Sequence, residues 1–444
     1  MSTRAVPPRA VGTREAPAVG TGGRLARTRP RLLTRTWVAT LALAMVIASD
    51  YKLRSREADS SLAGQVDAQI LVEIGVYAAV AAFLALQLVT PPSLVPARRL
   101  LAPAWGWAAF MALSVVWAIY PPSAAVRGVQ LLIIAGLAHT IAAYARREHL
   151  HLLAHTYVVV TVLSVFLGVV VPSTGRRRFD WLQVHPVVVG TYLGLTITIL
   201  VAYLVRSRAD RRRFSPSWPI WVYVVALAIC VAALLATRTR GAMGAAVVGT
   251  MVALLLNSRR PRRIDILAVT AVIVTLGLLA YGPVIGRFLS RGADVENLET
   301  FNGRTPLWSA AIRFFADQPL VGYGLTAAKG LFLDTIGLGG GHNAFINVLI
   351  DGGLIGTALW LWLIVVVIST IRRLWGCTSV SADLPMLAAM MAFFLVNSMT
   401  YEGLGAAANL SNVWCYVIVG WLAVLARQAG QESTGLRRET NRLG

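Results

Sequence analysis

Long apolar runs recur along most of the chain and are separated by short segments that carry arginine. Most of them reach the roughly 20 residues that a helix needs to cross a hydrocarbon layer about 30 Å thick, and only the first is clearly short. A soluble domain could not bury this much apolar surface, because 57% of the residues are hydrophobic and only 14% are charged. We therefore predict an all-α, polytopic membrane protein of about 12 transmembrane helices. The runs lie near residues 36–49, 69–90, 100–120, 124–144, 151–171, 183–205, 218–237, 241–256, 264–282, 343–369, 383–400 and 409–427.

The chain is strongly basic, with a formal net charge of +21. Much of this charge lies in the tails and in short loops beside the apolar runs, where it sets topology and meets anionic lipid headgroups. We therefore predict contacts with membrane lipids and none with nucleic acid. Cys230 and Cys415 lie in apolar runs and Cys377 lies in a loop, so no disulfide framework, metal site or cofactor is predicted.

The charges of the loops predict the orientation of the chain. With the N-terminus inside, all five inner loops are basic, as the positive-inside rule requires, and both termini are cytoplasmic. The chain then divides into a disordered basic tail over residues 1–35, a membrane domain over 36–427 with a long outer loop at 283–342, and a second tail over 428–444. The inner loops are those that hold Arg98 and Arg99, Arg146 and Arg147, Arg206 to Arg213, Arg259 to Arg263, and Arg372 and Arg373.

A set of arginines falls on the predicted outer face, where the positive-inside rule disfavours them. A guanidinium group binds phosphate through two parallel hydrogen bonds, so such a set suits an anionic substrate at the outer leaflet. Arg178, Arg240 and Arg304 come from separate loops that could converge on it. The alternative is that each contacts lipid headgroups, as we expect of Arg287 and Arg291. The set comprises Arg176, Arg177, Arg178, Arg238, Arg240 and Arg304.

The long outer loop carries the signature of an amphipathic helix. Thr305 is a suitable N-cap, Pro306 suits the first helical position, and apolar side chains such as Trp308 then recur at helical spacing. Arg304 precedes this start, where backbone N–H groups and the helix dipole would reinforce anion binding. The residues after Asp317 end the helix, and Gly322-Tyr323-Gly324 predicts a tight turn. Trp308 either supports the site or only anchors the helix at the membrane surface.

His342 stands at the mouth of the next membrane helix. A helix N-terminus disfavours a protonated imidazole, so His342 could act as a neutral general base; the alternative is that it only caps the helix. Asn343, Asn347 and Asp351 follow at i+4 spacing and form a polar stripe that should face other helices rather than lipid.

Small residues open another membrane helix, directly after Arg240. Gly241, Gly244 and Ala245 would allow a neighbouring helix to approach closely. This close packing is also the simplest explanation for their presence, so they are not in themselves evidence of a site.

Four segments together resemble a known family. The runs NGRTPLWSAAIRFFADQPLVGYGL (302–325) and GGHNAFINVLIDGGLIG (340–356) resemble the O-antigen ligase and polymerase superfamily of bacterial envelope proteins, whose members share an Arg–Trp–Pro–Gly loop and a His-Asn pair before a Gly-rich helix. The segment TRTRGA (237–242) is similar to the family's outward Ser-Arg segment, and RRRFDWLQVHPVVVG (176–190) to its Arg…Asn-Pro segment, although His185 replaces the asparagine. The resemblance spans roughly residues 170–425.

The resemblance implies an inverting, metal-independent glycosyltransferase in the cytoplasmic membrane. Such an enzyme takes a glycan from an undecaprenyl-diphosphate carrier at the outer leaflet and joins it to a hydroxyl of a glycan, lipid or protein acceptor. His342 then matches the family's essential histidine, and Arg240, Arg304 and, less directly, Arg178 match its diphosphate-binding arginines. Asn343, Trp308 and Glu402 would support the site. The sequence does not distinguish a ligase from a polymerase, because the two differ in the acceptor.

Two other functions remain open on the sequence. A metal-dependent polyprenyl-sugar glycosyltransferase would use an acidic residue after the first membrane helix, where Asp50, Glu57 and Asp59 lie, although these also suit a solvated loop. A non-enzymatic flippase for lipid-linked glycans would also need basic groups, but along a path through the bilayer rather than at one face.

Overall fold

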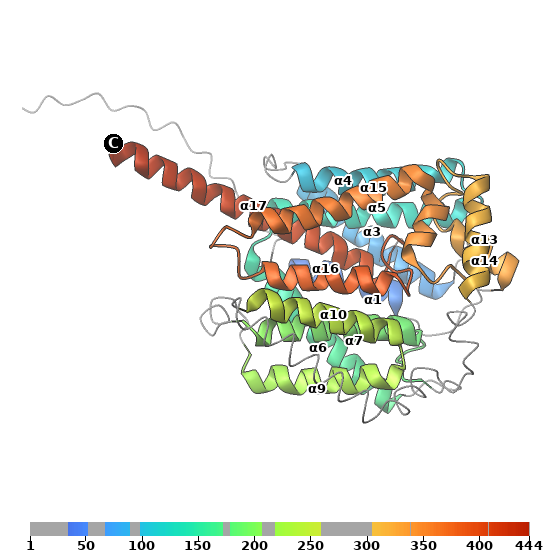
Figure 1. Cartoon of the computed structure of the whole chain (residues 1–444), viewed down its shortest axis with the longest axis horizontal. Coiled ribbons are helices and arrows are strands. Elements are labelled where there is room, and N and C mark those ends of the chain that lie inside the picture. Colours follow the sequence, from blue (N-terminus) through green and yellow to red (C-terminus); the bar gives the residue numbers. More distant parts are fainter. Residues whose placement is uncertain are drawn as a thin grey trace, which may run out of the picture. The chain divides into compact units, whose positions relative to one another are not determined.

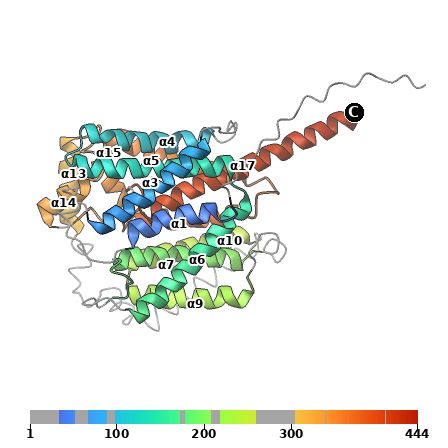
Figure 2. The ribbon, with the colours of Figure 1, turned by 180° about the vertical axis from the view of Figure 1, so that it is seen from behind.

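The chain folds as a bundle of helices that run side by side (Figures 1 and 2). The computed structural model describes residues 34–51, 67–88, 98–171, 178–206, 218–258, 304–337, 339–406 and 408–443, and residues 35–444 form one compact unit. Its helices are α1 (Trp37–Asp50), α3 (Ala68–Leu88), α4 (Arg98–Leu113), η2 (Ser114–Val116), α5 (Pro121–Tyr144), α6 (Arg147–Val170), α7 (Pro186–Leu204), α9 (Ile220–Thr237), α10 (Arg240–Asn257), α13 (Arg304–Asp317), α14 (Ala327–Ile336), α15 (Ala344–Leu374), α16 (Leu384–Ser398) and α17 (Leu410–Leu443).

The prediction of an all-α, polytopic membrane protein is confirmed. Among the described residues, nine helices are long and apolar enough to cross a membrane, and α1 and α16 are shorter apolar helices. Eleven of the predicted runs coincide with helices, whereas the run near 264–282 and most of the predicted tail 1–35 lie outside the described residues. At the other terminus, α17 continues without a break into the segment 428–444.

Two ends of the bundle can be named by residues that lie there. Helices α1, α6, α9 and α16 end, and α7, α10, α15 and α17 begin, at what we call the His342 end. Helices α6 and α16 begin at the opposite end, which we call the Asp383 end. The described parts of the loops that the charge pattern predicts on the outer side therefore lie at the His342 end.

Close packing fills the bundle where small residues face large ones. Helix α10 packs along α7 and α16, α17 along α5, and α15 along α4. In α7, a Cβ built on Gly194 would lie 2.6 Å from the Phe393 ring of α16, so only glycine fits this crossing. Such small residues let helices approach when no hydrophobic effect drives their association in lipid.

The clearest departure from the predicted spans lies in α15, which is broken at Gly353. The φ of Gly353 is 58° and its ψ is −159°, a conformation that favours glycine. The loop between α13 and α14 enters this break: Leu354 N–H donates to the Pro319 carbonyl at 2.9 Å, and Tyr323 N–H donates to the Ile350 carbonyl at 2.9 Å. The break therefore leaves its backbone groups paired with the loop rather than exposed to lipid.

The same loop explains why α4 is shorter than the run at 100–120. Helix α4 ends at Leu113, and the next residues turn to meet the loop. The Ser114 hydroxyl accepts a hydrogen bond from Leu325 N–H at 2.9 Å, and Ile119 N–H donates to the Tyr323 carbonyl at 3.1 Å. The predicted turn at 322–324 is confirmed, with φ values of 66° at Gly322 and 90° at Gly324.

Helix α13 confirms the amphipathic helix predicted in the long loop. It ends at Asp317 as predicted but begins at Arg304, so Thr305 lies inside its first turn and is not the N-cap that the pattern predicts. This difference of one residue is within the usual scatter of helix ends. Its buried face packs against α14 and α15, with Trp308 partly buried beside it and Ile312 exposed on the other face. The shared core comprises Leu307, Ala310, Ala311, Ala328, Phe332 and Ile350.

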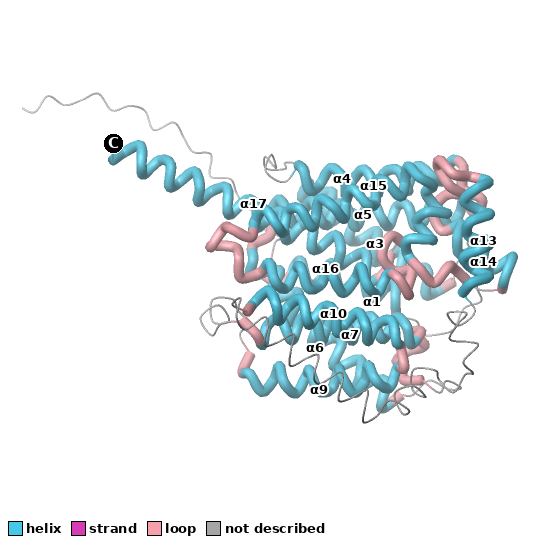
Figure 3. The backbone as a smooth tube through the Cα atoms, in the orientation of Figure 1, coloured by secondary structure: helices cyan, strands magenta, loops and turns pink. Residues whose placement is uncertain are grey.

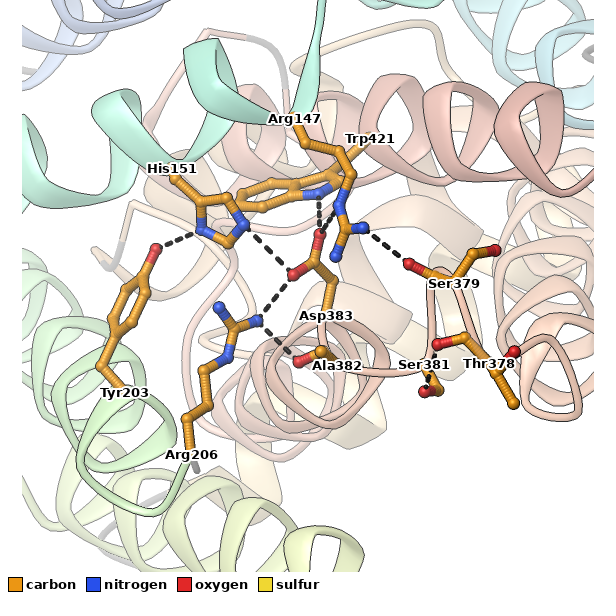
Figure 4. Close-up of polar contacts among 10 residues, drawn as sticks. All are labelled: Arg147, His151, Tyr203, Arg206, Thr378, Ser379, Ser381, Ala382, Asp383 and Trp421. Atoms are coloured by element: carbon orange, nitrogen blue, oxygen red, sulfur yellow. Dashed lines mark hydrogen bonds and ion pairs between the residues drawn. The ribbon is translucent and has the colours of Figure 1, made fainter. Parts of the chain in front are cut away.

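A buried carboxylate ties several helices together at the Asp383 end (Figure 4). Asp383 Oδ1 accepts from Arg206 at 2.7 Å and lies 3.1 Å from His151 Nε2. Asp383 Oδ2 accepts from Arg147 Nε at 3.0 Å and from Trp421 Nε1 at 3.2 Å. Although burial opposes a charged carboxyl, these neighbours hold the pKa of Asp383 well below its usual value. The start of α16 is thereby joined to α6, to α17 and to the residues after α7.

Candidate active site at the His342 end

His342 lies on a tight turn just before α15. Gly340 has a φ of 130° and His342 a φ of 48°, which is uncommon for a residue with a side chain. The N-cap of α15 is Asn343, whose side-chain oxygen accepts from Phe345 N–H at 2.9 Å and from Ile346 N–H at 3.3 Å. The alternative that His342 caps this helix is therefore wrong. Its side chain is exposed, which leaves the imidazole accessible to a substrate.

Glu402 packs against this turn from the loop between α16 and α17. A Cβ on Gly340 would overlap the Glu402 carboxylate, so the two are in direct contact. Asn347 joins them: its Nδ2 donates to Glu402 Oε2 at 3.2 Å, and its Oδ1 accepts from Gly341 N–H at 2.9 Å. Burial raises the pKa of Glu402, an effect opposed by the positive charge available on His342, by the Asn347 hydrogen bond and by Lys329 of α14.

Arg240 is the first residue of α10 and follows a turn of two residues after α9. In this turn Arg238 has a φ of 51° and is exposed. The Thr239 hydroxyl donates to the Pro186 carbonyl at 3.0 Å and accepts from Arg178 at 2.9 Å. The turn is therefore fixed against the start of α7, and Arg240 is half-buried where the N–H groups of a helix begin.

Arg178 binds the protein itself. Its Nε donates to the Thr237 carbonyl at 2.7 Å, in addition to the bond from its Nη2 to Thr239. Both bonds go to the turn that precedes Arg240. Among the other arginines of the predicted set, Arg176 and Arg177 lie outside the described residues.

The segments that carry Arg240 and Glu402 are in contact through the neighbouring residues Gly241 and Thr400. A Cβ on Gly241 would overlap the side chain of Thr400, two residues before Glu402. The Asn343 side chain also donates to the Met399 carbonyl at 3.3 Å. The start of α10, the loop after α16 and the turn that carries His342 therefore meet at one place. Figure 3 shows the loops at this end of the bundle in pink.

Arg304 is the first residue of α13, and the described side chains of that helix begin at Leu307. Helix α13 shares its core with Phe332 of α14. A Cβ on Gly341 would lie 3.0 Å from the Phe332 ring, so α14 supports the His342 turn from the other side. The contact of Arg304 with the site remains a prediction.

The polar stripe of α15 divides into two roles. Asn343 and Asn347 hold the His342 turn, as described above. Asp351 is buried deeper and accepts from Ala328 N–H at 2.7 Å and from Thr326 N–H at 3.0 Å, so it fixes the start of α14. All three side chains face protein, as the sequence predicts.

His185 and Asp50 both have structural partners. His185 is the N-cap of α7, where its Nδ1 accepts from Val187 N–H at 3.3 Å, a bond that an asparagine in this position could also make. Asp50 Oδ2 accepts from Leu410 N–H at 2.9 Å and from the Tyr192 hydroxyl at 3.1 Å, so it joins α1 to the start of α17 rather than standing in a solvated loop.

Within the part of the chain that the structure describes, no group of three or more His, Cys, Asp or Glu side chains could hold a metal ion. Glu57 and Asp59, the other acidic residues considered in the metal-dependent alternative, lie outside that part.

Residues 225–361 match the family model described as O-antigen ligase. Over this segment the chain is similar to the O-antigen ligase family. The match begins in α9 and ends in α15, and it includes Arg240, Arg304, Trp308 and His342 but neither Arg178 nor Glu402. No curated protein matches the chain. The match supports, in general terms, a multi-pass membrane enzyme of glycan transfer or polymerisation.

The contact pattern adds residues that sequence reasoning did not assign to the site. The sequence marks Asn347 only as part of the polar stripe, and no motif marks Thr400 or Lys329 as a site residue. The signal for Thr400 is its place two residues before Glu402. Lys329 lies on α14, a short helix whose nearness to His342 no local pattern encodes.

Proposed function

We propose that this protein transfers a glycan from a polyprenyl-diphosphate carrier to an acceptor hydroxyl at the outer face of the cytoplasmic membrane. The observation that carries the proposal is the meeting, at one end of the bundle, of an exposed His342, the start of α10 with Arg240, and the loop of Glu402. The family match supports the same chemistry in general terms.

In the proposed reaction His342 accepts the proton of the acceptor hydroxyl as its oxygen attacks the anomeric carbon. The bond between that carbon and the phosphate oxygen breaks, and its electron pair leaves with the polyprenyl diphosphate. A single displacement inverts the anomeric centre. A diphosphate leaves readily, so the protein needs to hold it, offset its charge and orient the acceptor.

Arg240 and Arg304 are the proposed donor ligands, because each begins a helix where backbone N–H groups also favour an anion. Arg178 takes a different part in the proposal. Its hydrogen bonds to Thr237 and Thr239 support a role in shaping the turn that presents Arg240.

The two other functions are less well supported. The Asp50 carboxylate already accepts from Leu410 N–H at the start of α17 and from the Tyr192 hydroxyl of α7, which accounts for it without a metal-dependent reaction. A flippase would need basic groups along a path through the bilayer, whereas Arg178, Arg238 and Arg240 all lie at one end of the bundle.

The direct test is an assay of purified protein with a polyprenyl-diphosphate-linked glycan and candidate acceptors. The proposal expects glycan on the acceptor and free polyprenyl diphosphate in equal amounts. A second carrier-linked chain as the only productive acceptor would identify a polymerase, and a lipid or protein acceptor would identify a ligase. Movement of the intact donor between leaflets, with no transfer to any acceptor, would contradict it.

A further inference from the structure

The turn that carries His342 has a backbone that needs an external support. Within three residues, both Gly340 and His342 have positive φ, and His342 carries a side chain in a region that costs such residues roughly 1 kcal/mol or more. Such conformations persist when the surrounding contacts hold them. At this turn the contacts come from Asn347, Phe332 and Glu402.

Glu402 makes the central contact of this support. Its carboxylate fills the space beside Gly340 and accepts from Asn347 Nδ2 at 3.2 Å. The orientation of the Asn347 amide is set from the other side, because its Oδ1 is already bonded to Gly341 N–H. Asn347 therefore presents its N–H donor to residue 402, where the Glu402 carboxylate accepts it.

The loop that holds Glu402 is itself fixed on both sides. Before it, Thr400 packs against Gly241 at the start of α10. After it, the Gly403 carbonyl accepts from Asn409 Nδ2 at 2.8 Å, and Gly405 N–H donates to Asn412 at 3.0 Å. The position of Glu402 is therefore fixed independently of the His342 turn, so Glu402 can hold that turn in place.

Resting on the proposed transfer reaction, we propose that Glu402 is a positioning residue: its carboxylate holds the Gly340–His342 turn so that the imidazole of His342 meets the acceptor hydroxyl. Glu402 takes no proton from the substrate in this scheme. It acts only through His342, and this restriction makes the proposal testable.

The charges around Glu402 set the conditions under which it can act. The basic groups on the elements packed around its loop are His342, Lys329 of α14 and Arg240 at the start of α10, and Asp351 of α15 is an acidic group that also interacts with it. Burial raises the pKa of Glu402, so the carboxylate is lost at a higher pH than an exposed glutamate would lose it. Protonation turns one acceptor oxygen into a donor, so transfer should weaken as pH falls through this raised pKa.

The experiment combines two variants, Glu402→Gln and His342→Ala, with their double variant, in the full-length protein. Transfer from a carrier-linked glycan is measured as kcat and as KM for the donor. Glu402→Gln should lower kcat about 10- to 100-fold, the effect of a small misplacement of a catalytic group, with the KM for donor nearly unchanged. The double variant should be no slower than His342→Ala alone, because Glu402 has nothing left to position.

Gly340→Ala tests the same contact while Glu402 remains in place. The added Cβ overlaps the Glu402 carboxylate, so the variant should show the same selective loss of kcat even if Glu402→Gln does not accumulate. Glu148→Gln, at the Asp383 end, is the matched control and should keep wild-type rates. The pH profile of Glu402→Gln should also lose the decline on the acid side that comes from Glu402.

Wild-type rates in Glu402→Gln, or a further loss of rate when it is added to His342→Ala, would overturn the positioning role. A wild-type protein that transfers no glycan would instead contradict the proposed function itself, so the two failures are distinguishable.

Discussion

Gly241 lies so close to Thr400 that no side chain fits between them. Gly241 follows Arg240 at the start of α10, and Thr400 leads into the loop of Glu402. The contact therefore sets the distance between the proposed donor ligand and the support of the proposed base. Close packing therefore explains the glycine at position 241. It does not explain the glycine at position 244, because nothing lies within 4 Å of a Cβ built on Gly244.

The two glycines predict opposite outcomes for the same substitution. Gly241→Ala should destabilise the protein by about 1–3 kcal/mol and impair transfer, because α10 or the Thr400 loop must move. Gly244→Ala should be neutral or stabilise the helix by up to about 1 kcal/mol. Thermal unfolding in detergent, with transfer assays on both variants, measures the contrast. Equal stability of the two variants would show that the Gly241 contact is not rigid.

Arg240→Lys and Arg304→Lys should each impair transfer although the charge is retained. Lysine lacks the planar fork that binds two phosphate oxygens, and the loss of one charge-assisted hydrogen bond of about 1.5 kcal/mol corresponds to roughly tenfold in rate. Amounts of folded protein in the membrane should match the wild type. Full activity in both variants would favour simple charge or lipid contact as the role of these arginines.

His342→Ala should lower the transfer rate by about 10²- to 10⁴-fold while the donor still binds, because a general base acts at the chemical step. The assay is run with and without EDTA, which should not change the wild-type rate. Asp50→Ala serves as the comparison and should act through stability, since it removes the acceptor for Leu410 N–H. Chelator-sensitive activity that survives in His342→Ala and disappears in Asp50→Ala would support the metal-dependent alternative.

Asp383→Ala should destabilise the bundle by about 3–5 kcal/mol, because Arg147 and Arg206 lose the buried carboxylate that they share. Glu148→Ala is the matched control: Glu148 pairs with Arg146 at 3.5 Å on the surface, and its loss should cost less than about 1 kcal/mol.

The pH dependence of this effect follows from the depressed pKa of Asp383. The stabilisation by the Asp383 carboxylate is fully present above the pKa of about 3.9 that aspartate has in the unfolded chain. It is lost only as the pH falls through the lower pKa that Asp383 has in the folded protein. The difference between the wild type and Asp383→Ala should therefore stay constant from about pH 8 to about pH 5. A difference that shrinks within this window would show that Asp383 is not charged in the folded protein.

The orientation in the membrane is tested by single-cysteine labelling in a background without Cys230, Cys377 and Cys415. Thr335→Cys on α14 should react with an impermeant reagent in intact cells, because α14 is predicted to face outward. Gly376→Cys, in the loop after α15, should react only after the cells are opened. Both positions are exposed, so access to solvent is matched. The reverse pattern would place the His342 end in the cytoplasm.

Much of the fold was predictable from the sequence because spanning a membrane imposes a local rule. Each run of about 20 apolar residues must satisfy its own backbone as a helix, so the runs near 124–144, 183–205 and 218–237 locate α5, α7 and α9, although the first turns of α5 and α7 differ from the prediction. The Thr305-Pro306 signal, which is also local, predicts the start of α13 to within one residue. Arg240 is recognisable in the sequence because the positive-inside rule disfavours an arginine on the outer face. His342 is recognisable because a titratable side chain stands at the mouth of a membrane helix.

Only the tertiary structure decided what those residues touch. The break at Gly353 depends on Pro319 and Tyr323, which reach it from a loop some 30 residues earlier. Asp351 could equally have joined two membrane helices, and Arg178 could equally have faced a ligand; the structure pairs them with the start of α14 and with Thr239. Hydropathy and helix signals act over one turn or one span, whereas these pairings join segments distant in sequence. The sequence by itself therefore determined the spans and the candidate residues, and the packing between loops determined which of them meet.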